Sequence, residues 1–169
     1  TATNNLKLNG IPREKIFFVG NTMIDTLIKH RSYFIKPAIW DQVGLVENNY
    51  IIMTLHRPAN VDEEQTLKVL INEIIRYSSK IPIIFPVHPR TEKQLKKLGP
   101  FAKNFHTIGP LKYLEFNFLV EKSKAVITDS GGITEETTVM NVPCMTIRNN
   151  TERPETIDLG TNELIGTEP

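Results

Sequence analysis

Short apolar runs alternate along this chain with longer segments in which apolar residues recur every three or four positions. The runs do not alternate with polar residues, which indicates buried strands covered on both faces. They predict strands at 16–19, 50–55, 81–87, 104–108, 124–128, 144–147 and 162–165. The amphipathic segments predict helices at 23–34, 62–75, 92–98, 113–122 and 132–141, with a connector at 36–49 and a turn at 157–160. Asp62 is the expected N-cap of the second helix.

This order of elements predicts an α/β fold, in which a doubly wound parallel sheet carries helices on both faces. With 169 residues the chain is long enough for one well-packed domain. We expect residues 1–15 to be a leading or interdomain segment and residues 16–169 to form a Rossmann-like domain. Because the chain begins at Thr1 without a methionine and stops just after the last predicted strand, we expect a fragment of a longer protein.

Polar residues follow four of the predicted strands, at the edge of the sheet where open α/β folds bind their ligands. The residues at these strand ends are His56 and Arg57, then His88, then Asp129, Ser130, Gly131 and Gly132, and finally the segment 148–155. The four ends would therefore bring His, Arg, Ser and Glu side chains and a pair of glycines to one edge. A purely structural explanation permits this coincidence but does not require it.

The sequence TDSGGITEE at 128–136 combines a strand end, a glycine turn and the start of a helix. A helix start presents free backbone N–H groups and a positive dipole end, which suit a phosphate. Because a carboxylate would repel phosphate, Glu135 or Glu136 is expected to reach past it to ribose hydroxyl groups. Each feature also has a structural explanation, which stays open. The glycines could serve a turn that needs positive φ, the histidines could make structural hydrogen bonds, and Arg153 could form a surface ion pair.

The sequence lacks the motifs of several other kinds of binding or catalytic site. Neither a G-x-G-x-x-G dinucleotide fingerprint nor a Walker lysine motif occurs. The four histidines lack the i, i+4 spacing of a zinc helix. Ser130 lacks the G-x-S-x-G context of a nucleophile elbow. We therefore expect no metal and no cofactor.

Composition limits the kinds of partner and the cellular compartment that we expect for this protein. A formal net charge of +1 gives no support for a nucleic acid or an anionic membrane as partner. No apolar run approaches the roughly 20 residues of a membrane span, and we find no signal peptide. The single cysteine, Cys144, cannot form an internal disulfide, which fits a reducing compartment. We therefore expect a cytoplasmic protein.

Taken together, these motifs resemble those of the non-hydrolysing UDP-N-acetylglucosamine 2-epimerases. The match covers almost the whole chain, in the order VGNTMIDT at 19–26, TLHRPANVD at 54–62, FPVHPRT at 85–91, TDSGGITEE at 128–136, RNNTERPET at 148–156 and GTNELIGT at 160–167. The TDSGGITEE and TERPE segments together are the most specific part. The resemblance implies the C-terminal half of a glycosyltransferase-B-type enzyme, in which two Rossmann-like domains face each other across the substrate.

The resemblance also implies a reaction, the interconversion of UDP-N-acetylglucosamine and UDP-N-acetylmannosamine at carbon 2. The family's mechanism eliminates UDP, passes through a 2-acetamidoglucal intermediate and adds UDP back. The expected partners are therefore UDP-N-acetylglucosamine and UDP. The family commonly forms dimers, so a homodimer is expected for the full-length enzyme.

Individual roles follow from the matching positions. The resemblance places Ser130, Gly131 and Gly132 at the diphosphate, Arg153 at the phosphates, Glu136 at the ribose, and Phe116 and Leu111 beside the uracil. His56 matches an active-site histidine that aids the departure of UDP, as an acid or as a charge partner.

Two departures from the family pattern matter. Many bacterial members read His-Arg-Arg-Glu-Asn where this chain reads HRPAN at 56–60, which weakens the case for a regulatory UDP-sugar site containing Arg57 and His88. The second departure concerns the family's proton-abstracting carboxylates, which belong to an N-terminal domain that we expect to lie outside this chain. We therefore expect the isolated chain to bind UDP weakly and not to epimerise.

Three alternatives remain at this point. The chain could be the nucleotide half of a UDP-sugar glycosyltransferase, which would share the fold and the ligand class. It could belong to a hydrolysing epimerase, which releases free N-acetylmannosamine and UDP. It could also be a binding or regulatory domain without catalysis.

Overall fold

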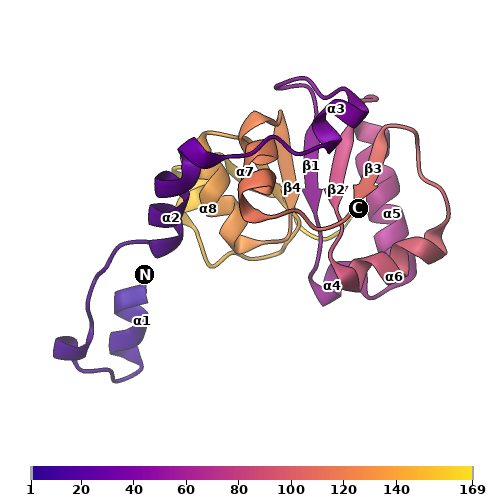
Figure 1. Ribbon diagram of the computed structural model, residues 1–169. Helices are drawn as coiled ribbons and strands as arrows, with labels where there is room; N and C mark the ends of the chain where they lie inside the picture. The colour runs from indigo at the N-terminus through magenta and orange to yellow at the C-terminus, as the bar shows by residue number, and fades with distance from the viewer. Residues whose placement is uncertain (1, 169) are drawn as a thin grey trace.

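The structure is a computed structural model that describes residues 2–168, apart from the side chain of Arg90 (Figure 1). Its described residues form a six-stranded parallel sheet with the strand order β3-β2-β1-β4-β5-β6. The strands are β1 (Ile51–Thr54), β2 (Ile83–Pro86), β3 (Phe105–Ile108), β4 (Ala125–Thr128), β5 (Cys144–Thr146) and β6 (Asn162–Leu164). The prediction of a doubly wound parallel sheet is therefore confirmed.

Helices connect these strands. They are α1 (Ala2–Leu8), α2 (Thr22–His30), α3 (Ile39–Val43), α4 (Pro58–Val61), α5 (Glu64–Tyr77), α6 (Pro89–Leu98), α7 (Tyr113–Lys122), α8 (Gly131–Met140) and α9 (Glu155–Asp158), with 3₁₀ turns η1 (Arg13–Lys15) and η2 (Arg31–Tyr33). The carboxylate of Glu63 caps α5 by accepting hydrogen bonds from the backbone N–H groups of Gln65 and Thr66. The prediction that Asp62 is this cap was wrong, because Asp62 has helical backbone angles and ends α4.

Side chains of the central strands alternate between two core layers, one on each face of the sheet. On one face, Met53 of β1 belongs to a cluster with Leu67 of α5. On the other face, Ile52 of β1 belongs to a cluster with Leu27 of α2 and Leu119 of α7. Helices therefore bury both faces of the sheet, which is why its strands are apolar without alternation.

The apolar run at 16–19 does not form the predicted strand. Phe17, Phe18 and Val19 are 78%, 90% and 72% exposed, and none of the described strands pairs with them. The preceding helix α1 has no buried residue and lies apart from the sheet (Figure 1). The run has the composition of a buried strand, but composition alone does not supply a neighbouring strand.

Three other elements differ from their predicted bounds. The expected connector at 36–49 contains α3, whose Trp40 packs against Tyr50 and Phe118 with ring centroids 5.7 and 5.4 Å apart. The helix expected at 23–34 ends at His30, and Leu27 is its buried residue. The turn expected at 157–160 overlaps α9. For α3, the packing of Trp40 accounts for a helix that the periodicity of the segment did not predict.

None of the described helices is both long enough and apolar enough to cross a membrane.

Replacing a core isoleucine should destabilise the fold far more than replacing an exposed one. Ile84 is 0% exposed, so Ile84→Ala is expected to lower the free energy of unfolding by about 3 kcal/mol through lost burial and a cavity. Ile28 on α2 is 61% exposed, and Ile28→Ala should change it by less than about 0.5 kcal/mol. Urea denaturation of both variants measures the difference; equal effects would contradict the assigned core.

Candidate functional site

The sheet reverses its winding between β1 and β4. β1 leads to β2 and β3 on one side, whereas β4 leads to β5 and β6 on the other. The two strands pair in register from Ile51 with Ala125 to Thr54 with Thr128. Because the connecting loops diverge at such a switch point, a crevice opens beyond the carboxyl ends of the two strands. The residues that follow Thr54 and Thr128 therefore lie where a ligand is expected.

Asp129 joins the two loops at this crevice. Its buried carboxylate accepts hydrogen bonds from the backbone N–H groups of His56 (3.0 Å) and Arg57 (2.8 Å) and from the side-chain amide of Asn60 (3.1 Å). Nδ1 of His56 lies 2.7 Å from Oδ1 of the same carboxylate. Asp129 belongs to the TDSGGITEE segment, but nothing in that sequence indicates its contact with His56.

The start of α8 lies in the same turn. Ser130 is the N-cap residue, its side chain makes no capping hydrogen bond to a described residue, and Gly131 and Gly132 begin the helix. The N–H groups of this first turn are therefore open to a ligand or water. Neither glycine has a positive φ, so a left-handed backbone conformation does not explain why glycine occupies these positions. A Cβ on Gly132 would lie 2.8 Å from Cε of Met23, the flexible end of that side chain, which would have to move aside.

Two arginines and a glutamate surround this corner. Arg148 is buried and donates two hydrogen bonds to the Glu152 carboxylate, at 2.7 and 2.8 Å. These bonds lower the pKa of Glu152 to about 2. Arg57 donates from Nε to the backbone carbonyl of Asp129 at 3.0 Å, and its Nη2 lies 3.8 Å from Glu152. A Cβ on Gly131 would lie 3.4 Å from Oε2 of Glu152, so these charges border the helix start.

Arg153 is oriented by a buried carboxylate. Its Nε lies 2.9 Å from Oε1 of Glu135, and the Asn21 side chain donates to the same oxygen at 2.7 Å. Asn21 also caps α2 by accepting hydrogen bonds from the backbone N–H groups of Met23 and Ile24. The VGNTMIDT motif thus ties the N-terminal part of the chain to α8, a role that its sequence alone did not reveal. The Arg153 side chain is 43% exposed and faces solvent in part.

Glu136 lies one position further along α8 and faces a small hollow. Burial raises the pKa of its carboxyl group, and Oε1 accepts a hydrogen bond from the Tyr113 hydroxyl at 3.0 Å. Burial and the neighbouring Glu136 raise the pKa of Tyr113 to about 12. The hollow measures about 250 Å³ and is lined by Thr22, Met23, Thr26, Tyr113 and Glu136. A carboxylate that accepts hydrogen bonds at the wall of this small hollow suits hydroxyl groups.

Leu111 and Phe116 lie together in a second hollow. It measures about 260 Å³, has mostly apolar walls, and is lined by Thr54, Leu55, Pro86, Val87, His88, Pro89, Pro110, Leu111 and Phe116. His88 thus borders this hollow, and its ring centroid is 6.5 Å from that of His56. The structure therefore brings the two predicted base-contacting residues together at the ends of β1 and β2.

The site residues predicted from the sequence thus divide among three neighbouring places. His56 and Arg57 border the helix start with Ser130, Gly131 and Gly132; Glu136 lines one hollow; and Leu111, Phe116 and His88 line the other. Arg153 is held by Glu135 beside α8. Among the described residues, no cluster of three or more His, Cys, Asp or Glu side chains is arranged to hold a metal ion.

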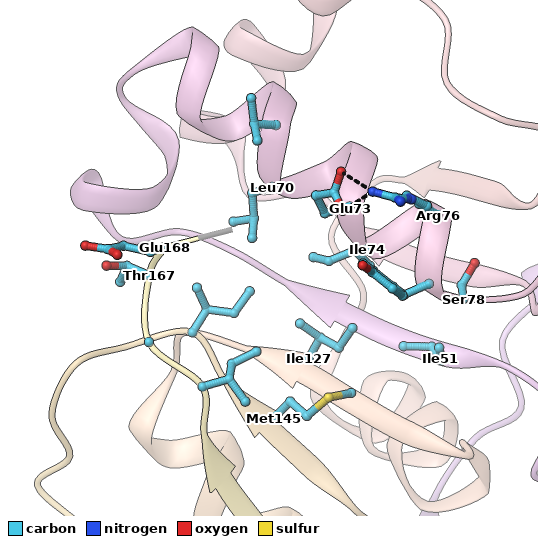
Figure 2. Close-up of a pocket in the computed structure, with 15 residues that line it drawn as sticks. Ile51, Leu70, Glu73, Ile74, Arg76, Ser78, Ile127, Met145, Thr167 and Glu168 are labelled. Atoms are coloured by element: carbon cyan, nitrogen blue, oxygen red, sulfur yellow. Dashed lines mark hydrogen bonds and ion pairs between the residues drawn. The ribbon is translucent and has the colours of Figure 1, made fainter.

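A larger groove lies elsewhere, between α5 and the adjoining face of the sheet. Figure 2 shows Ile51, Ile127 and Met145 on the strands opposite Leu70 and Ile74 of α5, and the groove measures about 670 Å³. Its walls are mostly apolar, and it is not at the carboxyl ends of β1 and β4. Size alone does not supply the convergent polar groups that a chemical site needs. We therefore assign the functional site to the sheet edge.

Comparison with known proteins identifies the family. The model of the UDP-N-acetylglucosamine 2-epimerase family matches residues 1–169. The UDP-N-acetylglucosamine 2-epimerase of Methanocaldococcus jannaschii is 41% identical over 177 residues, covering 98% of this chain and 48% of that protein. A UDP-2,3-diacetamido-2,3-dideoxy-D-glucuronate 2-epimerase of Pseudomonas aeruginosa is 33% identical over 169 residues, covering 98% and 46%.

A solved structure gives the same result. The crystal structure of the M. jannaschii enzyme in complex with UDP-GlcNAc and UDP superimposes with a TM-score of 0.84 at 40% identity, covering 99% of this chain and 48% of that one. The chain spans about half the length of these relatives. With a family model matching its whole length and the same fold as a solved relative, this chain belongs to the UDP-N-acetylglucosamine 2-epimerase family.

Proposed function

We propose that this chain is the nucleotide-binding half of an enzyme that interconverts UDP-N-acetylglucosamine and UDP-N-acetylmannosamine by elimination and re-addition of UDP. The observation that carries the proposal is the start of α8 at the β1–β4 switch point, with His56 held beside it through Asp129. A helix N-terminus suits a diphosphate, and a half-exposed histidine suits proton transfer. The solved relative that binds UDP-GlcNAc and UDP supports this choice of ligand.

The diphosphate would occupy the helix start. The N–H groups of Gly131 and Gly132 and the Ser130 hydroxyl would donate to its oxygens, and the dipole of α8 would favour its charge. Arg153 would add a charge-assisted hydrogen bond, with Glu135 holding its Nε and leaving the terminal nitrogens to turn toward the ligand. The same donors would stabilise the charge that develops as UDP departs.

The nucleoside would occupy the two hollows. Leu111 and Phe116 supply an apolar wall and an aromatic ring for uracil. The carboxylate of Glu136 would accept hydrogen bonds from ribose hydroxyl groups, while the Tyr113 hydroxyl keeps it oriented. The sheet edge thus offers a charged corner for the diphosphate and two hollows for the uracil and the ribose.

In the proposed reaction the base that removes the proton from carbon 2 comes from outside this chain. As that proton leaves, a double bond forms between carbons 1 and 2, and the bond from carbon 1 to the phosphate oxygen breaks. UDP departs with the electron pair, and His56 in its protonated form would donate a proton to it or balance its charge. Reprotonation at carbon 2 from the other face and the return of UDP complete the inversion.

The partners of the proposed enzyme are the rest of the protein and a second copy. An N-terminal domain would supply the carbon 2 acid and base, and the full-length enzyme would form a homodimer. A regulatory role for Arg57 and His88 stays a prediction. Arg57 contacts Asp129 and Glu152, and His88 lies beside His56, so both residues border the proposed catalytic site.

The first test is UDP binding by the 169-residue chain, measured by calorimetry. Arg153→Ala should weaken binding about 10-fold or more, because a charged hydrogen bond is lost. Ser130→Ala removes a neutral donor and should weaken binding roughly 3- to 10-fold. Arg76→Ala is the matched control, since Arg76 pairs with Glu73 on α5 and should leave binding unchanged. Unchanged affinity in both site variants, with the fold intact, would refute the assignment.

The second test concerns the division of the active site between two domains. The isolated chain should bind UDP yet produce no UDP-N-acetylmannosamine, because it lacks the carbon 2 acid and base. Anion-exchange chromatography of the nucleotide-sugars after prolonged incubation measures this. Epimerisation by the purified chain would show that the proton-transferring groups lie within it.

The third test separates the two epimerase outcomes and uses the full-length protein. A non-hydrolysing enzyme returns UDP to the sugar, so carbon NMR of the products should show UDP-linked N-acetylmannosamine. Accumulation of free N-acetylmannosamine with UDP would indicate the hydrolysing alternative instead. Transfer of the sugar to an added acceptor would indicate a glycosyltransferase.

A further inference from the structure

Asp129 is a buried carboxylate to which the proposed function assigns no role. It is 0% exposed, and its Oδ2 accepts hydrogen bonds from two backbone N–H groups and from the Asn60 amide. Its Oδ1 lies 2.7 Å from Nδ1 of His56 and also accepts a longer hydrogen bond, at 3.2 Å, from the backbone N–H of His56. Because the donors to Oδ2 come from the rigid turn after β1, the carboxylate is held in a single orientation.

A purely structural role explains only part of this arrangement. A buried carboxylate needs hydrogen bonds, and the backbone of His56 and Arg57 together with Asn60 provides them. The contact to the His56 ring is additional to this set. The ring is 46% exposed, so its packing does not require that position. If Asp129 served only to hold the turn after β1, its contact with the His56 ring would have no explanation.

Neighbouring cations do not compete for the carboxylate. Arg57 directs its Nε to the backbone carbonyl of Asp129, not to its carboxylate. Arg148 directs its two terminal nitrogens to Glu152 and Asn150. Oδ1 of Asp129 is thus available to the imidazole of His56.

We infer that Asp129 is a positioning residue that holds His56 in the tautomer with hydrogen on Nδ1 and leaves Nε2 as the reactive nitrogen. This inference rests on the proposed function for the role of His56 in the departure of UDP. When Nδ1 donates to a carboxylate, the neutral ring keeps its lone pair on Nε2. Ser130 follows Asp129 directly, so one short turn fixes the histidine relative to the proposed diphosphate site.

The tautomer can be measured directly in the 169-residue chain, by long-range ¹H–¹⁵N correlation NMR at a pH where the ring is neutral. His56→Gln identifies the His56 signals by their loss. The wild-type chain should show the Nδ1–H tautomer for His56. The Nε2–H tautomer, or an equal mixture of the two, would overturn the inference without any variant at Asp129.

The Asp129→Asn substitution tests whether Asp129 determines the tautomer of His56. The N–H donors at Oδ2 should hold the amide oxygen there, which turns the amide NH₂ group toward Nδ1 of His56. Nδ1 must then accept, so the tautomer should switch to Nε2–H. Asp41→Asn, on the exposed surface next to Lys36, is the control and should change nothing at His56. A folded Asp129→Asn chain that keeps the wild-type tautomer would overturn the inference.

Kinetics of the full-length enzyme distinguish this inference from the proposed function. Asp129→Asn should lower kcat about 100-fold with little change in KM, because a positioned acid or base contributes at least that factor. In a His56→Gln background the same substitution should cost little more, since it acts through the histidine. Equal losses in both backgrounds would show a structural role. An Nδ1–H tautomer in the chain, together with a full-length protein that shows no epimerase activity, would leave the positioning intact and refute the proposed function.

Discussion

The parallel pairing of β1 with β4 is the constraint on which the candidate site depends. It aligns Thr54 with Thr128, so the two strands end together and their following loops start side by side. The hydroxyl groups of these two threonines are 2.6 Å apart and join the strand ends. From that point the chain places His56 on one loop and the start of α8 on the other. A shift of register by one residue would separate them and turn the core side chains to the wrong faces.

The site is organised by buried charge as much as by its glycines. Asp129 is satisfied by the turn after β1, Arg148 is satisfied by Glu152, and Glu135 is paired with Arg153. The contacts of Asp129 and of Glu135 join different segments of the chain, whereas Arg148 and Glu152 lie four residues apart in the loop after β5. Such pairs lose much of their value if one partner is removed, because the remaining charge stays buried. The corner is therefore shaped before a ligand arrives, which limits the ordering that binding must produce.

Much of the fold follows from local pattern. The runs at 50–55 and 124–128 form central strands because they are mostly apolar and are followed by polar loop residues. The run at 16–19 has the same composition but lies exposed, since burial depends on a neighbouring strand and not on the run itself. Trp40 lies in a segment that reads as a connector and becomes helical through its packing on Tyr50 and Phe118.

The site was less accessible from sequence than the fold. The strand-end rule led to His56, Ser130 and the two glycines, because parallel strands end at one edge. The contact of His56 with Asp129 joins residues 73 positions apart, and no spacing rule predicts it. The same holds for the link between Asn21 and Glu135, which are 114 positions apart. These contacts depend on side-chain geometry that appears only once the sheet is assembled.

A UDP titration of the ¹⁵N-labelled chain, followed through its backbone amide signals, shows directly where the nucleotide binds. We expect the largest shifts at Gly131 and Gly132 in the first turn of α8, with further shifts at Leu111 and Phe116. Shifts confined to the groove between α5 and the sheet, at residues such as Leu70 and Met145, would contradict this expectation. In that case the larger groove, and not the sheet edge, would be the ligand site.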